Sequence, residues 1–94
     1  AHFSHCYPEG CSIYFTFAAS AEGRVKSDTL YDDIWRTGLA AVVKAGGTIS
    51  HHHGVGQAKA AFMRDEHGAA MGIYRQLKAA MDPHGILNPG KMGL

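Results

Sequence analysis

The chain has 94 residues, of which 46% are hydrophobic and 18% charged, and its formal net charge is +1. This composition predicts one small domain with an apolar core and excludes a disordered chain. The sequence has no Lys/Arg cluster that could neutralise a phosphate track, so we expect no nucleic-acid partner. We also expect no transmembrane segment, because no apolar run reaches the roughly 18–20 residues of a membrane span.

An N-terminal hairpin is the first expected element. Residues 2–6 are extended in character, residues 11–18 carry a β-branched and aromatic run, and Tyr7-Pro8-Glu9-Gly10 has the chemistry of a turn. The chain starts without methionine in residues that already resemble a strand, so we expect it to be a fragment of a longer protein. Cys6 and Cys11 form neither a disulfide framework nor a zinc motif, and we expect them to be free and packed.

A long helix is expected next. Ser27 or Asp28 can cap its start, apolar residues then recur at helical spacing as far as Ala45, and Gly46-Gly47 can end it. Residues 48–52 are predicted to be a second extended segment.

Helices also dominate the expected C-terminal half. Residues 57–63 are helix-prone, Gly68 can break the pattern, and residues 69–81 carry an apolar face. Asp82-Pro83 stops that helix, and residues 84–94 form a turn-rich tail. This order of elements predicts an α+β fold, a small antiparallel sheet with helices on one face.

The strongest candidate for chemistry is the triplet His51-His52-His53, which is bracketed by Gly46-Gly47 and Gly54-Val55-Gly56. In an extended segment the middle imidazole points to one face and the outer two to the other, which disfavours a single three-ligand metal cage. Histidines exchange protons near neutral pH, so acid–base or hydrogen-bonding work in an active site is one reading. A metal shared with His5 and a polar surface turn remain open alternatives.

Three other segments are weaker candidates. Tyr7, at the end of the strand that carries His5 and Cys6, can donate or accept a proton, although an interface tyrosine is the alternative. Lys59 follows the Gly54-Val55-Gly56 loop, which matches no nucleotide motif, and it can bind an anion or simply be solvated. We interpret Asp65-Glu66-His67 as a solvated face, and the tail as a structural lock.

These motifs together resemble the C-terminal part of FAD-linked oxidases of the vanillyl-alcohol oxidase type. The tail Asp82-Pro83 to Ile86-Leu87-Asn88-Pro89-Gly90-Lys91 is similar to the ending of many members. A sharper resemblance, to the alkyldihydroxyacetonephosphate synthase family, rests on Ser4-His5-Cys6-Tyr7, on the histidine triplet with its glycines and on Lys59. Related hydroxy-acid dehydrogenases usually carry Glu where this chain has His52.

The resemblance implies that the chain is part of a ferredoxin-like cap domain of a larger flavoenzyme, residues 1–94 being cap plus tail. FAD would be bound mainly by a domain absent from this chain, and that domain would be its partner. The implied reaction exchanges the acyl group of acyl-dihydroxyacetone phosphate for a fatty alcohol, without net redox change. The fragment alone is then expected to be inactive, and a homodimer is left open.

The resemblance also implies roles for individual residues. Tyr7, His52 and His53 would be catalytic, and other residues would lie near the substrate or cofactor: His5, Cys6, His51, Gly54, Lys59 and Asn88. No metal is expected in this reading. One alternative is an FAD-dependent dehydrogenase of a 2-hydroxy acid such as D-lactate, glycolate or D-2-hydroxyglutarate, with a metal at His5 and His52. Another is a non-catalytic metal-storage or interaction module.

Overall fold

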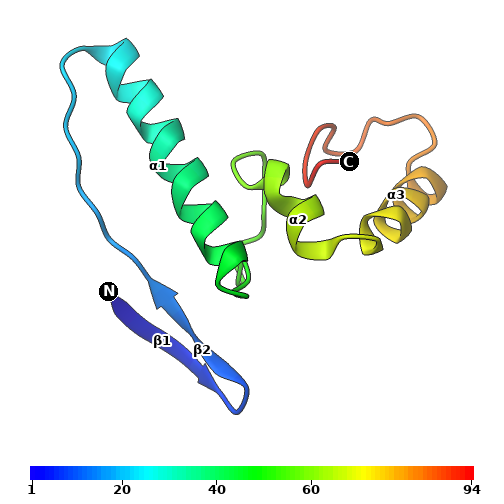
Figure 1. Ribbon diagram of the computed structural model, residues 1–94. Helices are drawn as coiled ribbons and strands as arrows, with labels where there is room; N and C mark the ends of the chain where they lie inside the picture. Colours follow the sequence, from blue (N-terminus) through cyan, green and yellow to red (C-terminus); the bar gives the residue numbers. More distant parts are fainter. The chain divides into compact units, whose positions relative to one another are not determined.

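The computed structural model describes residues 1–94, and its elements are a pair of antiparallel strands, three α-helices and one short 3-10 helix (Figure 1). They fall into two compact units, Ala1–Asp32 and Asp33–Leu94. The predicted α+β class is confirmed. The ferredoxin-like arrangement, with helices on one face of the sheet, stays a prediction.

The first unit contains the predicted hairpin, formed by β1 (His2–Tyr7) and β2 (Gly10–Tyr14). The ladder runs from the pair His2 and Tyr14 to the pair Tyr7 and Gly10. β2 ends at Tyr14 and is therefore shorter than the predicted strand over residues 11–18. Phe15 and Phe17 therefore lie outside the ladder, and both are exposed.

Helix α1 (Arg24–Lys44) begins earlier than expected. The backbone N–H of Ser27 donates to the carbonyl oxygen of Gly23 at 3.1 Å, which places Ser27 inside the first turn. The predicted cap at Ser27 or Asp28 is therefore wrong. The predicted end is confirmed: Gly46 has a φ of 76°, and the N–H of Gly47 donates to the carbonyl of Val42 at 3.0 Å. This is the Schellman pattern, in which glycine supplies the left-handed conformation.

The predicted extended segment over residues 48–52 is wrong. These residues form bends and the start of a turn, and no strand lies in the second unit. An extended segment needs a neighbouring strand for its backbone groups. Here the N–H of Ile49 donates instead to a carboxylate oxygen of Glu66 at 2.8 Å.

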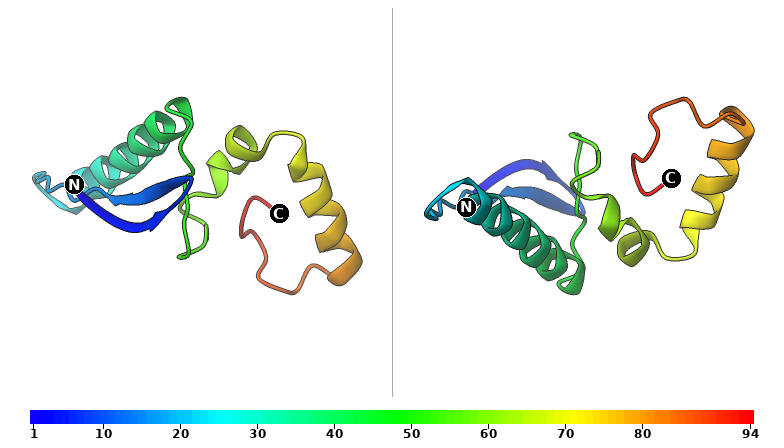
Figure 2. Two further views of the ribbon diagram at one scale, coloured as in Figure 1. Left: turned by 90° about the horizontal axis from the view of Figure 1, so that it is seen from below. Right: turned by 90° about the horizontal axis from the view of Figure 1, so that it is seen from above.

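Three further helical segments lie in the second unit. A 3-10 helix, η1 (Ala60–Phe62), leads into α2 (Met63–His67), in place of the single helix predicted over residues 57–63. Gly68, with a φ of 52°, separates α2 from α3 (Ala70–Met81), as predicted. Helix α3 ends before Asp82-Pro83, and the tail then turns back from its end into the arc of α2 and α3 (Figure 2).

The second unit has a compact apolar core of Leu39, Ile49, Met63 and Met71. Ile49 connects the loop after α1 to this core, because its side chain is 95% buried there. It lies two positions before the first histidine of the triplet. None of the helices combines the length and the apolar character needed to cross a membrane.

Candidate functional site: the histidine turn and the bulged hairpin

The histidine triplet lies in a turn of the second unit, with its side chains gathered rather than alternating. The ring centroids of His51 and His52 are 4.6 Å apart, and those of His52 and His53 are 4.3 Å apart. The Nδ1 atoms of His51 and His52 are within hydrogen-bond distance of each other. All three residues are exposed. The predicted alternation of the three imidazoles is therefore wrong, because the backbone here is a turn and not an extended strand.

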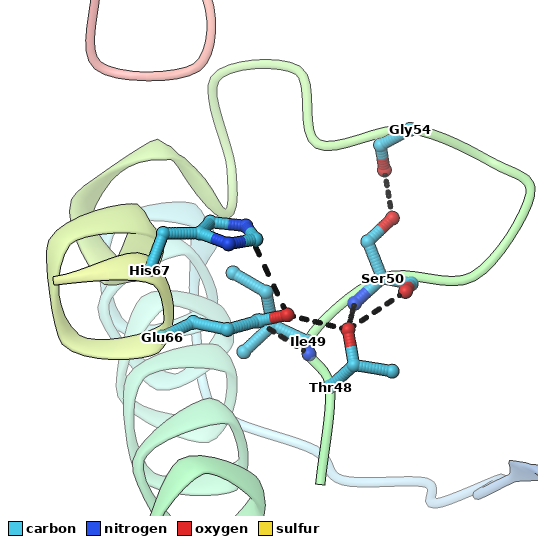
Figure 3. A network of polar contacts seen from close by, with 6 residues as sticks. All are labelled: Thr48, Ile49, Ser50, Gly54, Glu66 and His67. Atoms are coloured by element: carbon cyan, nitrogen blue, oxygen red, sulfur yellow. Dashed lines mark hydrogen bonds and ion pairs between the residues drawn. The ribbon is translucent and has the colours of Figure 1, made fainter. Parts of the chain in front are cut away.

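The side chains of Ser50 and Glu66 hold the loop that carries this turn through three hydrogen bonds (Figure 3). The hydroxyl of Ser50 donates to the carbonyl oxygen of Gly54 at 2.7 Å and so closes the turn around the triplet; residues 50–54 are called the histidine turn below. The carboxylate of Glu66 accepts the Thr48 hydroxyl at 2.5 Å and the Ile49 N–H at 2.8 Å. Charge-assisted hydrogen bonds of this kind are stronger than neutral ones. The segment that leads into the histidine turn is therefore held by the buried side chain of Ile49 and by the carboxylate of Glu66.

Glu66 has a structural role that the sequence does not indicate. Its side chain is only 16% exposed, and its Oε1 lies 3.9 Å from Nε2 of His67. The prediction of a solvated face is correct for Asp65, which is exposed, and wrong for Glu66. No local pattern could have identified it, because its partners lie 17 and 18 positions earlier.

The C-terminal tail contacts the chain just after the histidine turn, at Gly56. The backbone N–H of Met92 donates to the carbonyl oxygen of Gly56 at 3.2 Å. Gly93 approaches η1 so closely that an added Cβ would lie 3.2 Å from the carbonyl oxygen of Ala60. The tail is therefore a structural lock, as predicted, and it acts on the loop that follows the triplet.

Of two predicted substrate-proximal residues, Lys59 is half-buried and Asn88 is exposed. Lys59 immediately precedes η1, and its side chain makes no capping bond to that helix. Asn88 has a φ of 44° and lies in the tail, where its carbonyl accepts the N–H of Lys91 at 3.4 Å. Gly54, also predicted, is in direct contact with Ser50 at the end of the histidine turn.

His5 is an extra residue in the first unit's hairpin. Ser4 pairs with Ser12 and Cys6 pairs with Cys11, so His5 forms a β-bulge between them. Its φ is 52°, a left-handed conformation that is uncommon for a residue with a side chain. The Ser4 hydroxyl lies 2.8 Å from its Nδ1. Bulges re-aim side chains, and strained residues of this kind cluster at functional sites.

Tyr7 ends β1 directly before the Pro8–Glu9 turn, as predicted, and its side chain is exposed. His5, Cys6 and Tyr7 therefore form one exposed group, and the triplet with Gly54 forms another in the second unit. Cys6 and Cys11 are free, as expected, but they are exposed rather than packed, because a two-stranded hairpin has no interior.

The carboxyl group of Asp82, in the tail lock, has a lowered pKa. Asp82 is 7% exposed. A hydrogen bond from the Lys78 ammonium group lowers its pKa most, burial opposes that effect, and the N–H groups of Leu87 and Ile86, each at 2.9 Å, lower it further. Lys78 also donates to the carbonyl of Leu87. Asp82 therefore joins the end of α3 to the tail.

A shallow pocket of about 250 Å³ opens beside the loop that leads to the triplet. It is lined by Val43, Gly46, Gly47, Thr48, Asp65 and Glu66. Two carboxylate residues in one small pocket make it unsuitable for the pyrophosphate of a dinucleotide. What the described residues offer instead is proton exchange: a cluster of imidazoles in one unit and an exposed phenol in the other.

Comparison with known proteins places these features in a family. The family described as "FAD linked oxidases, C-terminal domain" matches residues 1–92. An alkyldihydroxyacetonephosphate synthase of Dictyostelium discoideum is 38% identical over 98% of this chain and 15% of its own length. An uncharacterised FAD-linked oxidoreductase of Escherichia coli strain K12 is 29% identical over 95% of this chain and 19% of its own.

A D-lactate dehydrogenase of Archaeoglobus fulgidus is 31% identical over 82% of this chain and 19% of its own length. The chain thus spans less than a fifth of these curated relatives. No solved structure matches it.

Proposed function

The chain belongs to the FAD-linked oxidases, as their C-terminal domain, and from this premise we propose that it serves an enzyme of the alkyldihydroxyacetonephosphate synthase type. The proposed reaction exchanges the acyl group of acyl-dihydroxyacetone phosphate for a fatty alcohol. Further proposals are that residues 1–94 are cap domain plus tail, and that the FAD-binding domain is another part of the same protein.

The observation that carries this proposal is the histidine turn. Its three clustered imidazoles are proton-exchanging groups, and the segment from Gly46 to Gly56 contains no carboxylate. A dehydrogenase of the related type would have Glu at position 52. A reaction without net redox change needs proton donors and acceptors beside the substrate carbonyl, and imidazoles fit that need. The identity to the Dictyostelium discoideum synthase supports the same choice.

FAD is the cofactor of the family, and the described residues fit one part of it. The exposed imidazoles of the histidine turn can hydrogen-bond with the polar edge of a flavin ring, and Gly54 and Gly56 leave open space where a Cβ would stand. The pocket lined by Asp65 and Glu66 does not fit the diphosphate. When bound, the flavin supplies a redox-active ring system. The proposed place of this chain is beside that ring.

Individual roles follow from the chemistry of the exposed groups. We assign Tyr7 as the acid–base group, since its phenol can hold or pass a proton. His52 and His53 assist that transfer, and His51 supports His52 through the contact between their Nδ1 atoms. His5 and Cys6 form pocket wall beside Tyr7. Three more substrate-proximal residues are proposed, Gly54, Lys59 and Asn88, with the ammonium group of Lys59 suited to a phosphate.

A dehydrogenase of a 2-hydroxy acid is the second candidate, and the likeness to the Archaeoglobus fulgidus D-lactate dehydrogenase favours it. It would use a metal at His5 and His52. These residues belong to different units, so this metal site remains a proposal.

One experiment separates the two candidates. The full-length protein, loaded with FAD, is given acyl-dihydroxyacetone phosphate and a fatty alcohol, and the ether product is measured. In parallel, D-lactate, glycolate and D-2-hydroxyglutarate are added anaerobically, and the flavin absorbance is followed with and without a chelator. Ether product without flavin bleaching supports the synthase reaction. Bleaching by a hydroxy acid that a chelator abolishes, with no ether product, would replace it by the dehydrogenase.

A further inference from the structure

Two cysteines face each other across the hairpin of the first unit. Cys6 in β1 and Cys11 in β2 are directly paired in the strand register, next to the pair Tyr7 and Gly10 that closes the turn. Both are free and exposed. Directly paired residues of an antiparallel ladder have their side chains on the same face of the sheet. The two thiols therefore share one accessible surface.

The pairing provides the spacing of a disulfide. Directly opposite residues in antiparallel strands have Cα atoms about 4.5–5.5 Å apart. A disulfide requires a Cα separation of roughly 4.4–6.8 Å. The bulge at His5 lies immediately before Cys6, and it shifts the register so that Cys6 meets Cys11. If His5 continued the regular ladder after the pair Ser4 and Ser12, Cys11 would pair with His5 instead of Cys6.

We propose that Cys6 and Cys11 form a redox-active dithiol, which closes to an intramolecular disulfide by exchange with a small-molecule disulfide such as oxidised glutathione. One cysteine thiolate attacks the small disulfide, breaks its S–S bond and releases one thiol. The other cysteine then attacks the mixed disulfide on its neighbour and releases the second thiol. Two protein thiols are oxidised, one small disulfide is reduced to two thiols, and the protons of the protein thiols are transferred to the released thiolates.

The disulfide closes a ring around the turn that carries Tyr7. The bond spans Tyr7-Pro8-Glu9-Gly10, and His5 lies just outside it. A two-stranded hairpin is marginally stable by itself, so a covalent link between its strands restricts the turn. Oxidation therefore fixes the conformation of the segment that presents the Tyr7 phenol, whatever reaction the full-length enzyme catalyses.

The test uses the full-length protein in glutathione buffers of increasing oxidised fraction. After trapping of the remaining thiols, the peptide that contains both cysteines is analysed by mass spectrometry. We expect Cys6 and Cys11 to lose their thiols together, with the loss of two hydrogen atoms from the peptide and no stable glutathione adduct. Cys11→Ser should instead leave a glutathione adduct on Cys6.

A matched control moves one thiol along β2. In Cys11→Ser combined with Ile13→Cys, the second thiol lies opposite Phe3 instead of Cys6. This variant should collect glutathione adducts without an internal disulfide. The proposal is overturned if the wild-type thiols both stay reduced, carry separate adducts, or link two molecules. It is also overturned if the control closes its disulfide as readily as the wild type.

Discussion

The carboxylate of Glu66, at the end of α2, accepts the backbone N–H of Ile49 at 2.8 Å, and this bond joins the helical part of the second unit to the loop that begins the histidine turn. The same carboxylate accepts the hydroxyl of Thr48. A loop can hold functional groups in place only if the rigid elements around it supply such bonds. Glu66 is therefore a positioning residue, and its removal should affect both stability and the histidine turn.

Glu66→Ala should lower the free energy of unfolding by about 1–3 kcal/mol, because it leaves the partly buried Ile49 N–H without its acceptor. Urea unfolding of the full-length protein measures this change. Asp65→Ala is the matched control, since Asp65 is an exposed neighbour, and it should stay within about 0.5 kcal/mol of the wild type. Equal effects of the two substitutions would contradict the positioning role.

Met63 is the most buried side chain of the second unit, at 1% exposure, and it belongs to the apolar core. Met63→Ala should cost about 2–5 kcal/mol in the free energy of unfolding, through lost burial and the cavity left behind. Met81→Ala makes the same chemical change at a site that is 79% exposed, and it should cost little. Equal urea midpoints for the two variants would contradict the placement of Met63 in the core of the second unit.

The lowered pKa of Asp82 predicts a loss of stability in acid. Because the unfolded state binds this proton more readily than the folded state, the stabilisation is complete above the pKa of an unfolded aspartate. It is lost as the pH falls from there through the lower folded pKa. Asp82→Asn should reduce the dependence of unfolding free energy on pH in this acid range.

The control for Asp82 is Asp33→Asn. Asp33 forms an ion pair with Arg36 at 2.9 Å, but both side chains are more than half exposed. Such surface pairs contribute little to stability, so the pH profile of this variant should follow that of the wild type. If the free energy of unfolding of Asp82→Asn depended on pH in the same way as that of the wild type, the Asp82 contacts would contribute nothing to folding.

Tyr7→Phe should reduce turnover of the full-length enzyme by about 10²–10⁴-fold if the phenol transfers a proton. The flavin content, measured by absorbance, should not change, because the substitution removes one oxygen atom from an exposed side chain. Tyr31→Phe removes the same atom from an exposed tyrosine in α1 and should keep full activity. Unchanged turnover of Tyr7→Phe would remove Tyr7 from the proposed site.

His52→Ala should also lower turnover by about 10²–10⁴-fold, since it removes the central imidazole of the histidine turn. The pH profile of kcat/KM should lose one limb if His52 exchanges a proton in the reaction. His84→Ala, in the exposed tail, is the control and should leave both quantities unaltered. A profile that keeps its shape while turnover falls would assign His52 a shaping role instead.

The ends of the helices could be predicted from the sequence, because the residues that determine them lie at those ends. Gly46-Gly47 ends α1 and Gly68 separates α2 from α3, since these turns need backbone conformations that glycine adopts at low cost. The family and its cofactor also followed from motifs in the chain, and the family match confirms them. The tail was correctly predicted as a lock, although its contact with Gly56 depends on the folded chain.

The failed predictions share a different cause. The conformation of residues 48–52 is decided by Glu66, which lies far along the chain, and no periodicity within the segment records that bond. Ser27 has the chemistry of a cap, yet Gly23 starts the helix before it. The roles of Tyr7 and of the triplet stay predictions, because their chemistry depends on the surroundings that the substrate meets.

The close approach of Gly93 to Ala60 restricts which residues position 93 can accept. An added Cβ would meet the Ala60 carbonyl oxygen at 3.2 Å, and the φ of 72° is one that other residues rarely adopt. A relative with a larger residue at this position would strain the backbone there and would have to shift its last residues away from the Ala60 carbonyl oxygen. Its loop after the histidine turn would then lose the contact between Met92 and Gly56, so position 93 should distinguish relatives whose tail supports the turn from those whose tail runs elsewhere.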